Sequence, residues 1–153
     1  MTSLEFGSIE REIHVDAPPE VVFEVVSSPE HISEWWTDDA SYEVKQGAVG
    51  EFVWGDRIDV LAMTVVTVEP PRLFAFRWCY PDNEVDDAVN SMLVTFELTP
   101  SGSGTTIRMV ETGFREMGWE VAKLEAQYND HVAGWDTFIP RLGEYIGKLV
   151  SAL

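Results

Sequence analysis

The chain has 153 residues, of which 27 are acidic and 10 basic, and this gives a formal net charge of −17 at pH 7. Its length is typical of one domain. Hydrophobic residues at 45% and charged residues at 24% are the balance of an ordinary globular protein. Such a negative field repels phosphate backbones and anionic lipids, so the composition argues against nucleic-acid binding and attachment to membrane surfaces. We therefore expect residues 1–153 to form a single domain.

The sequence offers no targeting or membrane signal. Its first residues carry neither a basic segment nor an apolar one, and no apolar run approaches the ~20 residues that span a bilayer. The single cysteine, Cys79, cannot form an internal disulfide and is expected to be inert. We therefore expect a cytoplasmic protein without membrane insertion.

Metal and cofactor motifs are also missing from the sequence. The three histidines are scattered, without the spacing of a zinc site. Residues 82–87 have the composition of a calcium loop but not its glycine or its final glutamate, so they are interpreted as a solvated acidic loop. We expect no metal site and no cofactor.

The first third of the chain predicts one strand and two short helices. Apolar and polar residues alternate from 9 to 15, which is typical of a half-buried strand. Pro18 and Pro19 then open a short helix over residues 17–26, because proline is favoured in the first turn. A second short helix begins near Pro29 and ends near Trp36.

The middle of the chain predicts a run of strands. We place them near residues 41–46, 49–54, 57–68, 72–80, 90–99 and 105–112. The Pro-Ser-Gly-Ser-Gly run at residues 100–104 predicts a hairpin between the last two strands. Short connections favour an antiparallel meander, since parallel pairs need long crossovers.

From residue 119 onward the apolar residues recur with helical spacing, so the C-terminal part predicts one long amphipathic helix. Together with the strands, this gives an α+β fold in which the helix packs on one face of an antiparallel sheet. A long helix across a curved sheet leaves a gap beside it, where we expect a ligand to bind.

One carboxylate breaks the apolar face of the predicted sheet. Strand phase places Glu111 with Ile107 and Met109 on the face that looks toward the helix. A buried carboxylate needs a partner, and His131, on the apolar stripe of the helix, is the candidate. Aromatic and methionine side chains around a few polar groups are typical of a small-molecule pocket, although the same stripe is often simply core.

Five segments resemble the START-like (SRPBCC) superfamily, in the branch named for the activator of heat shock protein 90 ATPase. They are residues 9–23, 32–37 (Ile-Ser-Glu-Trp-Trp-Thr), 68–78, 110–114 (Val-Glu-Thr-Gly-Phe) and 131–135 (His-Val-Ala-Gly-Trp), the last followed by Leu142. The five segments occur in the same order as in the family, and together they extend over about residues 8–150. The resemblance implies a helix-grip (Bet v 1-like) fold, with an antiparallel sheet wrapped around a long C-terminal helix and two short helices after the first strand.

The resemblance implies binding of a small hydrophobic or aromatic ligand, such as a lipid, sterol or polyketide-like molecule, in an interior cavity between sheet and helix. From the strand faces and the resemblance together, the predicted ligand-binding residues are Trp36, Phe76, Trp78, Met92, Phe96, Met109, Glu111, Tyr128, His131 and Trp135.

Two alternatives stay open. The first is a polyketide cyclase or dehydratase that uses the same cavity, with Glu111 and His131 exchanging a proton; the family has no universal catalytic residues, so catalytic residues are unknown. The second is a chaperone-linked or stress-response interaction protein, although the chain has no room for the second domain of the eukaryotic co-chaperone. An exposed edge strand could also support a homodimer.

Overall fold

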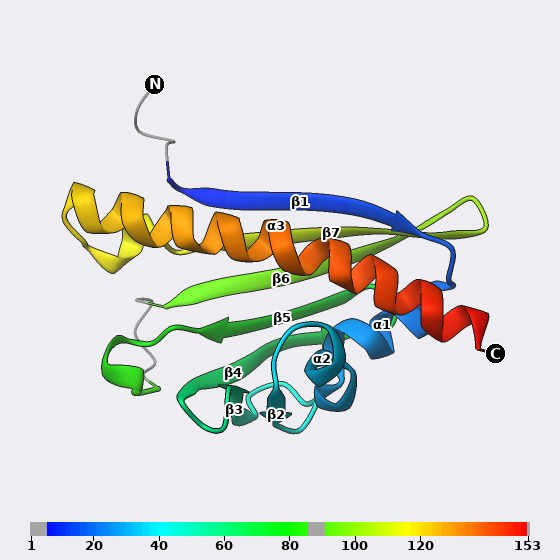
Figure 1. The fold of residues 1–153 in the computed structure, drawn as a ribbon, viewed down its shortest axis with the longest axis horizontal. Helices are drawn as coiled ribbons and strands as arrows, with labels where there is room; N and C mark the ends of the chain where they lie inside the picture. Colours follow the sequence, from blue (N-terminus) through cyan, green and yellow to red (C-terminus); the bar gives the residue numbers. More distant parts are fainter. Residues whose placement is uncertain (1–5, 86–90, 153) are drawn as a thin grey trace.

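The computed structural model describes residues 6–85 and 91–152 and confirms the expected α+β architecture. One antiparallel sheet is covered on a single face by helices, and the longest helix crosses that face diagonally (Figure 1). The elements are β1 (Ser8–Val15), α1 (Pro19–Ser27), α2 (Pro29–Trp35), β2 (Asp39–Ser41), β3 (Val49–Trp54), β4 (Asp59–Glu69), β5 (Leu73–Trp78), β6 (Met92–Ser101), β7 (Gly104–Thr112) and α3 (Val121–Ser151), with 3-10 turns at Pro81–Asn83 and Arg115–Met117.

The sheet has seven strands in the order β1-β7-β6-β5-β4-β3-β2, and every neighbouring pair is antiparallel. From β2 to β7 the chain forms the predicted meander. The hairpin between β6 and β7 turns at Gly102, whose φ of 61° suits a residue without a Cβ. β1 then pairs with β7, so the first strand lies beside the last.

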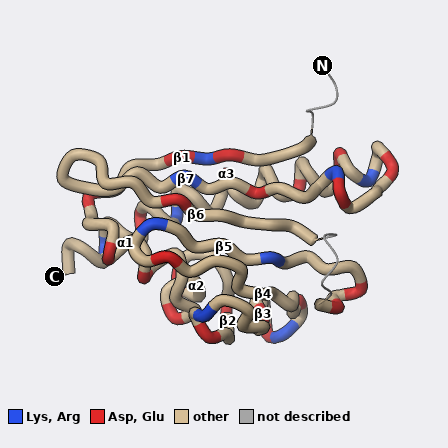
Figure 2. Tube along the Cα trace, turned by 180° about the vertical axis from the view of Figure 1, so that it is seen from behind, with Lys and Arg blue, Asp and Glu red and all other residues tan. Residues whose placement is uncertain are grey.

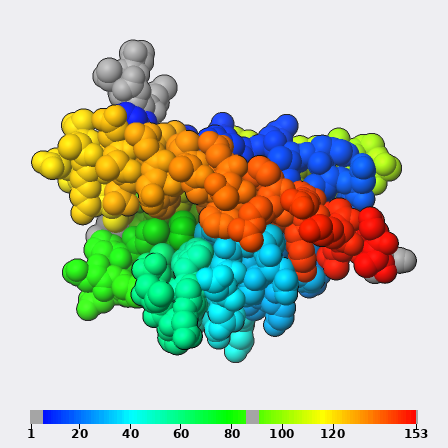
Figure 3. Space-filling view, viewed as in Figure 1, coloured from blue at the N-terminus to red at the C-terminus, as the bar shows by residue number. Residues whose placement is uncertain are grey.

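The helices begin where the prolines predict. Pro19 and Pro29 occupy the first turns of α1 and α2, where a missing N–H costs nothing. α3 is 31 residues long and continues through Pro140. In the space-filling view it crosses the whole width of the molecule, above the segments that carry α2 and β3 to β5 (Figure 3).

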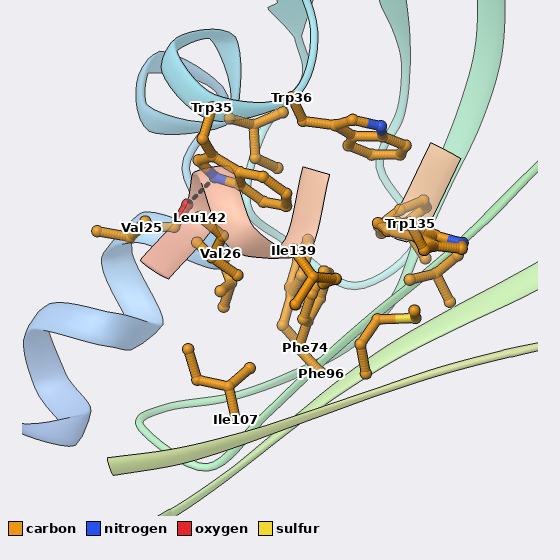
Figure 4. Packing of buried hydrophobic residues seen from close by; sticks show 14 of the residues in the cluster. Val25, Val26, Trp35, Trp36, Phe74, Phe96, Ile107, Trp135, Ile139 and Leu142 are labelled. Atoms are coloured by element: carbon orange, nitrogen blue, oxygen red, sulfur yellow. Dashed lines mark hydrogen bonds between the residues drawn. The ribbon is translucent and has the colours of Figure 1, made fainter. Parts of the chain in front are cut away.

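The core lies between the inner face of the sheet and the three helices. Trp35, at the end of α2, is buried among aliphatic and aromatic side chains, and its indole N–H donates to the carbonyl of Val25 at 3.1 Å (Figure 4). Trp35 therefore joins α1 to α2 beneath α3. The largest fully buried side chains are Trp35, Phe52, Phe74, Phe76, Phe96, Phe114, Ile9, Ile32, Met63, Met92, Ile107 and Met109.

The predicted strand at residues 41–46 is wrong. The observed β2 contains only residues 39–41, and the chain then turns away from the sheet. The Tyr42 hydroxyl donates to the Ser27 carbonyl in α1, and Gly47 takes a left-handed φ of 88°. The Tyr42 hydrogen bond holds the segment against α1, and the turn at Gly47 returns it to the sheet, where the Gly47 N–H donates to the Val65 carbonyl at 2.8 Å. Of the predicted acidic loop at residues 82–87, residues 82–85 are exposed, and residues 86 and 87 lie outside the described residues.

The negative charge lies on the surface. Seen from the sheet side, acidic positions are spread over strands, connections and helix ends (Figure 2). Within the described part of the chain, Glu111 is the one buried carboxylate, as the strand phase predicts.

Candidate functional site

A buried carboxylate with three N–H donors forms the centre of the site. Glu111, on the inner face of β7, has 0% of its side chain exposed. Its Oε2 accepts a hydrogen bond from the indole Nε1 of Trp78 at 2.8 Å. Its Oε1 accepts one from Nε1 of Trp135 at 2.8 Å and lies 2.8 Å from Nδ1 of His131. The desolvation of the carboxylate is therefore offset by hydrogen bonds on both oxygens.

The fold explains why these four groups meet. His131 and Trp135 are four residues apart on α3, so they project from one face of the helix. Glu111 pairs with Val94 of β6, and Val94 pairs with Phe76 of β5, which places Trp78 two positions further along the same strand face. The carboxylate thus connects β7, β5 and α3.

His131 is held in one orientation and keeps one nitrogen available. With Nδ1 directed at Glu111, Nε2 makes no hydrogen bond within the described residues. The ring packs against Trp78 and Phe114, with centroid distances of 5.5 and 5.2 Å. An imidazole whose Nδ1–H donates to a carboxylate presents Nε2 as an acceptor. His131 can therefore accept a hydrogen bond or exchange a proton at Nε2.

A small pocket lies beside His131, between the sheet and α3, and we call it the tryptophan pocket. Its volume is about 130 Å³. Trp36, just after α2, contacts the rings of three other tryptophans at centroid distances of 5.0 to 5.6 Å. An apolar cavity of about 150 Å³ holds one benzene ring, so this pocket has the size of one ring or one small alkylated group. Its lining residues are Trp36, Trp54, Trp78, Asp130, His131, Gly134, Trp135 and Phe138.

The predicted site residues divide into three groups. Four of them, Trp36, Trp78, His131 and Trp135, line the tryptophan pocket, and Glu111 lies behind it. Tyr128 lies on the β1 side of α3, where its hydroxyl donates to the Ser8 carbonyl at 2.7 Å. The others are fully buried in the core and do not line the pocket; they are Phe76, Met92, Phe96 and Met109.

Four lining residues were not predicted from the sequence. Trp54 shares a strand face with the buried Phe52, a period-two signal that could have identified it. Gly134 and Phe138 lie three and seven residues after His131, on the same helix face. Asp130 is exposed at the rim, and its place in the lining had no sequence signal.

Two further polar groups lie near this end of the sheet. Burial, with a contribution from the Glu111 carboxylate, raises the pKa of the Cys79 thiol, so the thiol is neutral at physiological pH. The Thr37 hydroxyl, one residue after Trp36, is buried and makes no hydrogen bond within the described residues. No group of three or more potential metal ligands occurs in that part of the chain.

A larger groove of about 510 Å³ lies on the surface, between the end of β1 and the C-terminal half of α3. It contains His14 and Asp16, both well exposed. The buried Glu111 and His131 lie elsewhere, at the tryptophan pocket. No helix in the described residues combines the length and hydropathy needed to cross a membrane.

A helix gripped by an antiparallel sheet, with two short helices after the first strand, defines a START-like (SRPBCC) fold, which is a ligand-binding type of fold. Residues 16–147 match the family model described as activator of Hsp90 ATPase homolog 1-like protein. The chain belongs to this family. No curated protein matches the chain.

Solved structures share the fold at low sequence identity. Protein MLL2253 from Mesorhizobium loti superposes with a TM-score of 0.75 at 24% identity, over 92% of this chain and 97% of that one. The Aha1 dimer from Colwellia psychrerythraea gives 0.67 at 18%, over 90% and 93%. DynU16, a putative protein in the dynemicin biosynthetic locus, gives 0.70 at 24%; 92% of this chain matches 47% of DynU16.

Proposed function

We propose that this protein binds a small apolar or aromatic ligand in the tryptophan pocket, with His131 contacting the ligand's polar end. The observation that carries the proposal is the position of the Glu111–His131 pair directly beside an aromatic pocket. A buried ionisable pair is costly to maintain in a core. A pocket with aromatic walls and few polar groups is the usual form of a small-molecule site.

The volume narrows the range of ligands. Drug-sized ligands occupy pockets of about 300–1,000 Å³, and this pocket offers about 130 Å³. One ring or one branched alkyl group of a ligand fits inside. The rest of a lipid or polyketide-like molecule would extend past the rim at Asp130, and a whole sterol would not fit without movement of α3.

Binding can be tested by thermal unfolding in the presence of phenol, indole or cholesterol, and by titration of the intrinsic tryptophan fluorescence with phenol. We expect phenol and indole to raise Tm and phenol to quench the fluorescence, whereas cholesterol should leave Tm unchanged. Gly134→Leu should abolish both responses, because an added Cβ at Gly134 meets only open space and the side chain would fill the pocket.

The matched control is Ala133→Leu, which adds similar bulk to the neighbouring, exposed position of α3. It should bind like the wild type. If no ligand changes either signal at millimolar concentration, the proposal is wrong. Equal responses from the Gly134→Leu and wild-type proteins would place binding outside the pocket.

A second candidate is acid–base catalysis in the same pocket. It is favoured by the Nδ1 contact of His131 with Glu111, which leaves Nε2 available for proton exchange, as in a histidine oriented by a carboxylate. Ligands that bind would be incubated with protein and analysed by mass spectrometry. Turnover by the wild type that falls about 10²–10⁴-fold in His131→Gln would support catalysis; unchanged ligands would refute it.

A further inference from the structure

The lining of the tryptophan pocket is both aromatic and acidic. Four tryptophans and one phenylalanine form its walls, Asp130 is exposed at its rim, and Glu111 lies behind it. Resting on the proposed function, we infer that the group bound in this pocket is a positively charged, alkylated ammonium group.

The tryptophan rings that line the pocket contact one another without forming a single stack. The Trp36 plane makes angles of 78° with Trp54 and 69° with Trp78, while Trp135 is inclined by 31° on another side. The tryptophans thus pack against one another in different orientations, and all four line the pocket. Aromatic cages of this type bind methylated ammonium groups, because the negative π-faces attract the cation without forming hydrogen bonds.

Two of the four indole N–H groups in the lining, those nearest His131 and Glu111, are already used. Trp78 and Trp135 both donate to Glu111, at 2.8 Å each. A neutral ligand that needs these two donors would have to compete with a buried carboxylate. An alkylated ammonium group needs no donor at all. Hydrogen bonding to an anion also shifts electron density into the indole ring, which strengthens the attraction of its face for a cation.

The charges around the pocket favour a cation. None of the described residues that line it is a lysine or arginine. Asp130 provides a carboxylate at the rim, and the net charge of −17 raises the local concentration of cations. One ring of the lining already has a cation over it: the Arg141 guanidinium lies 5.4 Å from the centroid of the Phe138 ring.

The test compares choline with 3,3-dimethylbutan-1-ol, which has the same shape but carries no charge. Both would be titrated into the full chain by isothermal calorimetry at low and at physiological salt. We expect choline to bind about tenfold more tightly, which is the size of a desolvated cation–π contribution. Asp130→Asn should weaken choline about threefold and leave the neutral alcohol unchanged. Glu125→Gln, the same charge change at an exposed site on α3, is the control and should change neither.

The possible results separate this inference from the proposed function. Equal binding of both molecules, abolished by Gly134→Leu, would leave the binding function standing and overturn the preference for a cation. Binding of neither molecule, with phenol and indole also inactive, would overturn both. Choline binding that survives Gly134→Leu would represent attraction to the acidic surface and would also overturn the inference.

Discussion

Replacing Glu111 with glutamine tests whether the stability of the fold depends on a buried carboxylate that accepts from three donors. Glutamine preserves the shape but offers one acceptor oxygen and one NH₂ group. If its oxygen accepts from Trp135 and His131, its NH₂ faces the Trp78 N–H, which sits 2.8 Å from the present Oε2. The reverse orientation leaves two donors facing the NH₂. At least one buried donor therefore loses its acceptor.

The cost can be worked from these contacts. A hydrogen bond to a charged acceptor contributes about 1.5–3 kcal/mol, and a buried donor without an acceptor costs about 1–3 kcal/mol. One lost bond and one unsatisfied indole N–H together give about 2.5–6 kcal/mol. This is a large part of the ~5–15 kcal/mol that stabilises a typical domain. We therefore expect Glu111→Gln to lower the free energy of unfolding by that amount.

The assay is urea unfolding followed by far-UV circular dichroism. The control is Glu97→Gln, at a half-exposed glutamate of β6 whose carboxylate pairs with Arg108 at the surface; it should cost less than about 1 kcal/mol. Trp78→Phe removes the facing donor, so the double variant should be at least about 1 kcal/mol more stable than the sum of the single effects. A cost of Glu111→Gln no greater than that of the control, or strict additivity with Trp78→Phe, would refute the reasoning.

Three further outcomes are expected. Thr37→Val should raise the free energy of unfolding by about 1 kcal/mol in urea titrations, since it removes a buried hydroxyl without a hydrogen-bond partner; destabilisation would show that the hydroxyl has one. Because burial raises the pKa of the Cys79 thiol, iodoacetamide should modify Cys79 at pH 8 at least about tenfold more slowly than free cysteine, as measured by mass spectrometry; an equal rate would contradict the burial. Gly113→Ala should destabilise the protein by more than about 2 kcal/mol, because φ is 114° and the new Cβ would lie 2.4 Å from the Ser91 carbonyl oxygen. The control Gly102→Ala places a Cβ with nothing within 4 Å and should cost less. Equal costs would mean that the backbone at Gly113 shifts to accommodate the new Cβ.

Much of the fold follows from local sequence patterns. Alternation predicted most of the strands, the prolines predicted where α1 and α2 begin, and helical spacing predicted α3. The phase of β7 also placed Glu111 inside and indicated His131 as its partner, which the 2.8 Å contact confirms. These features depend on periodicity, which a sequence displays directly.

The remaining details of the site depend on distances between side chains far apart in sequence. Periodicity placed Trp78 and Trp135 at the site but did not reveal that both donate to Glu111, because that depends on rotamers and on helix position. It also does not separate a packed inner face from a pocket wall. Phe76 and Met109 therefore appeared as lining residues, although both are fully buried in the core.

The four pocket tryptophans come from four separate parts of the chain: the residue after α2, β3, β5 and α3. Most of the sequence separates Trp36 from Trp135, so the pocket exists only after the final helix has docked onto the completed sheet. Because closing such long loops costs entropy before the contacts form, we expect these contacts to form late in folding. A bound ligand would therefore act mainly on the unfolding rate, lengthening the lifetime of the native state while leaving the rate of folding almost unchanged.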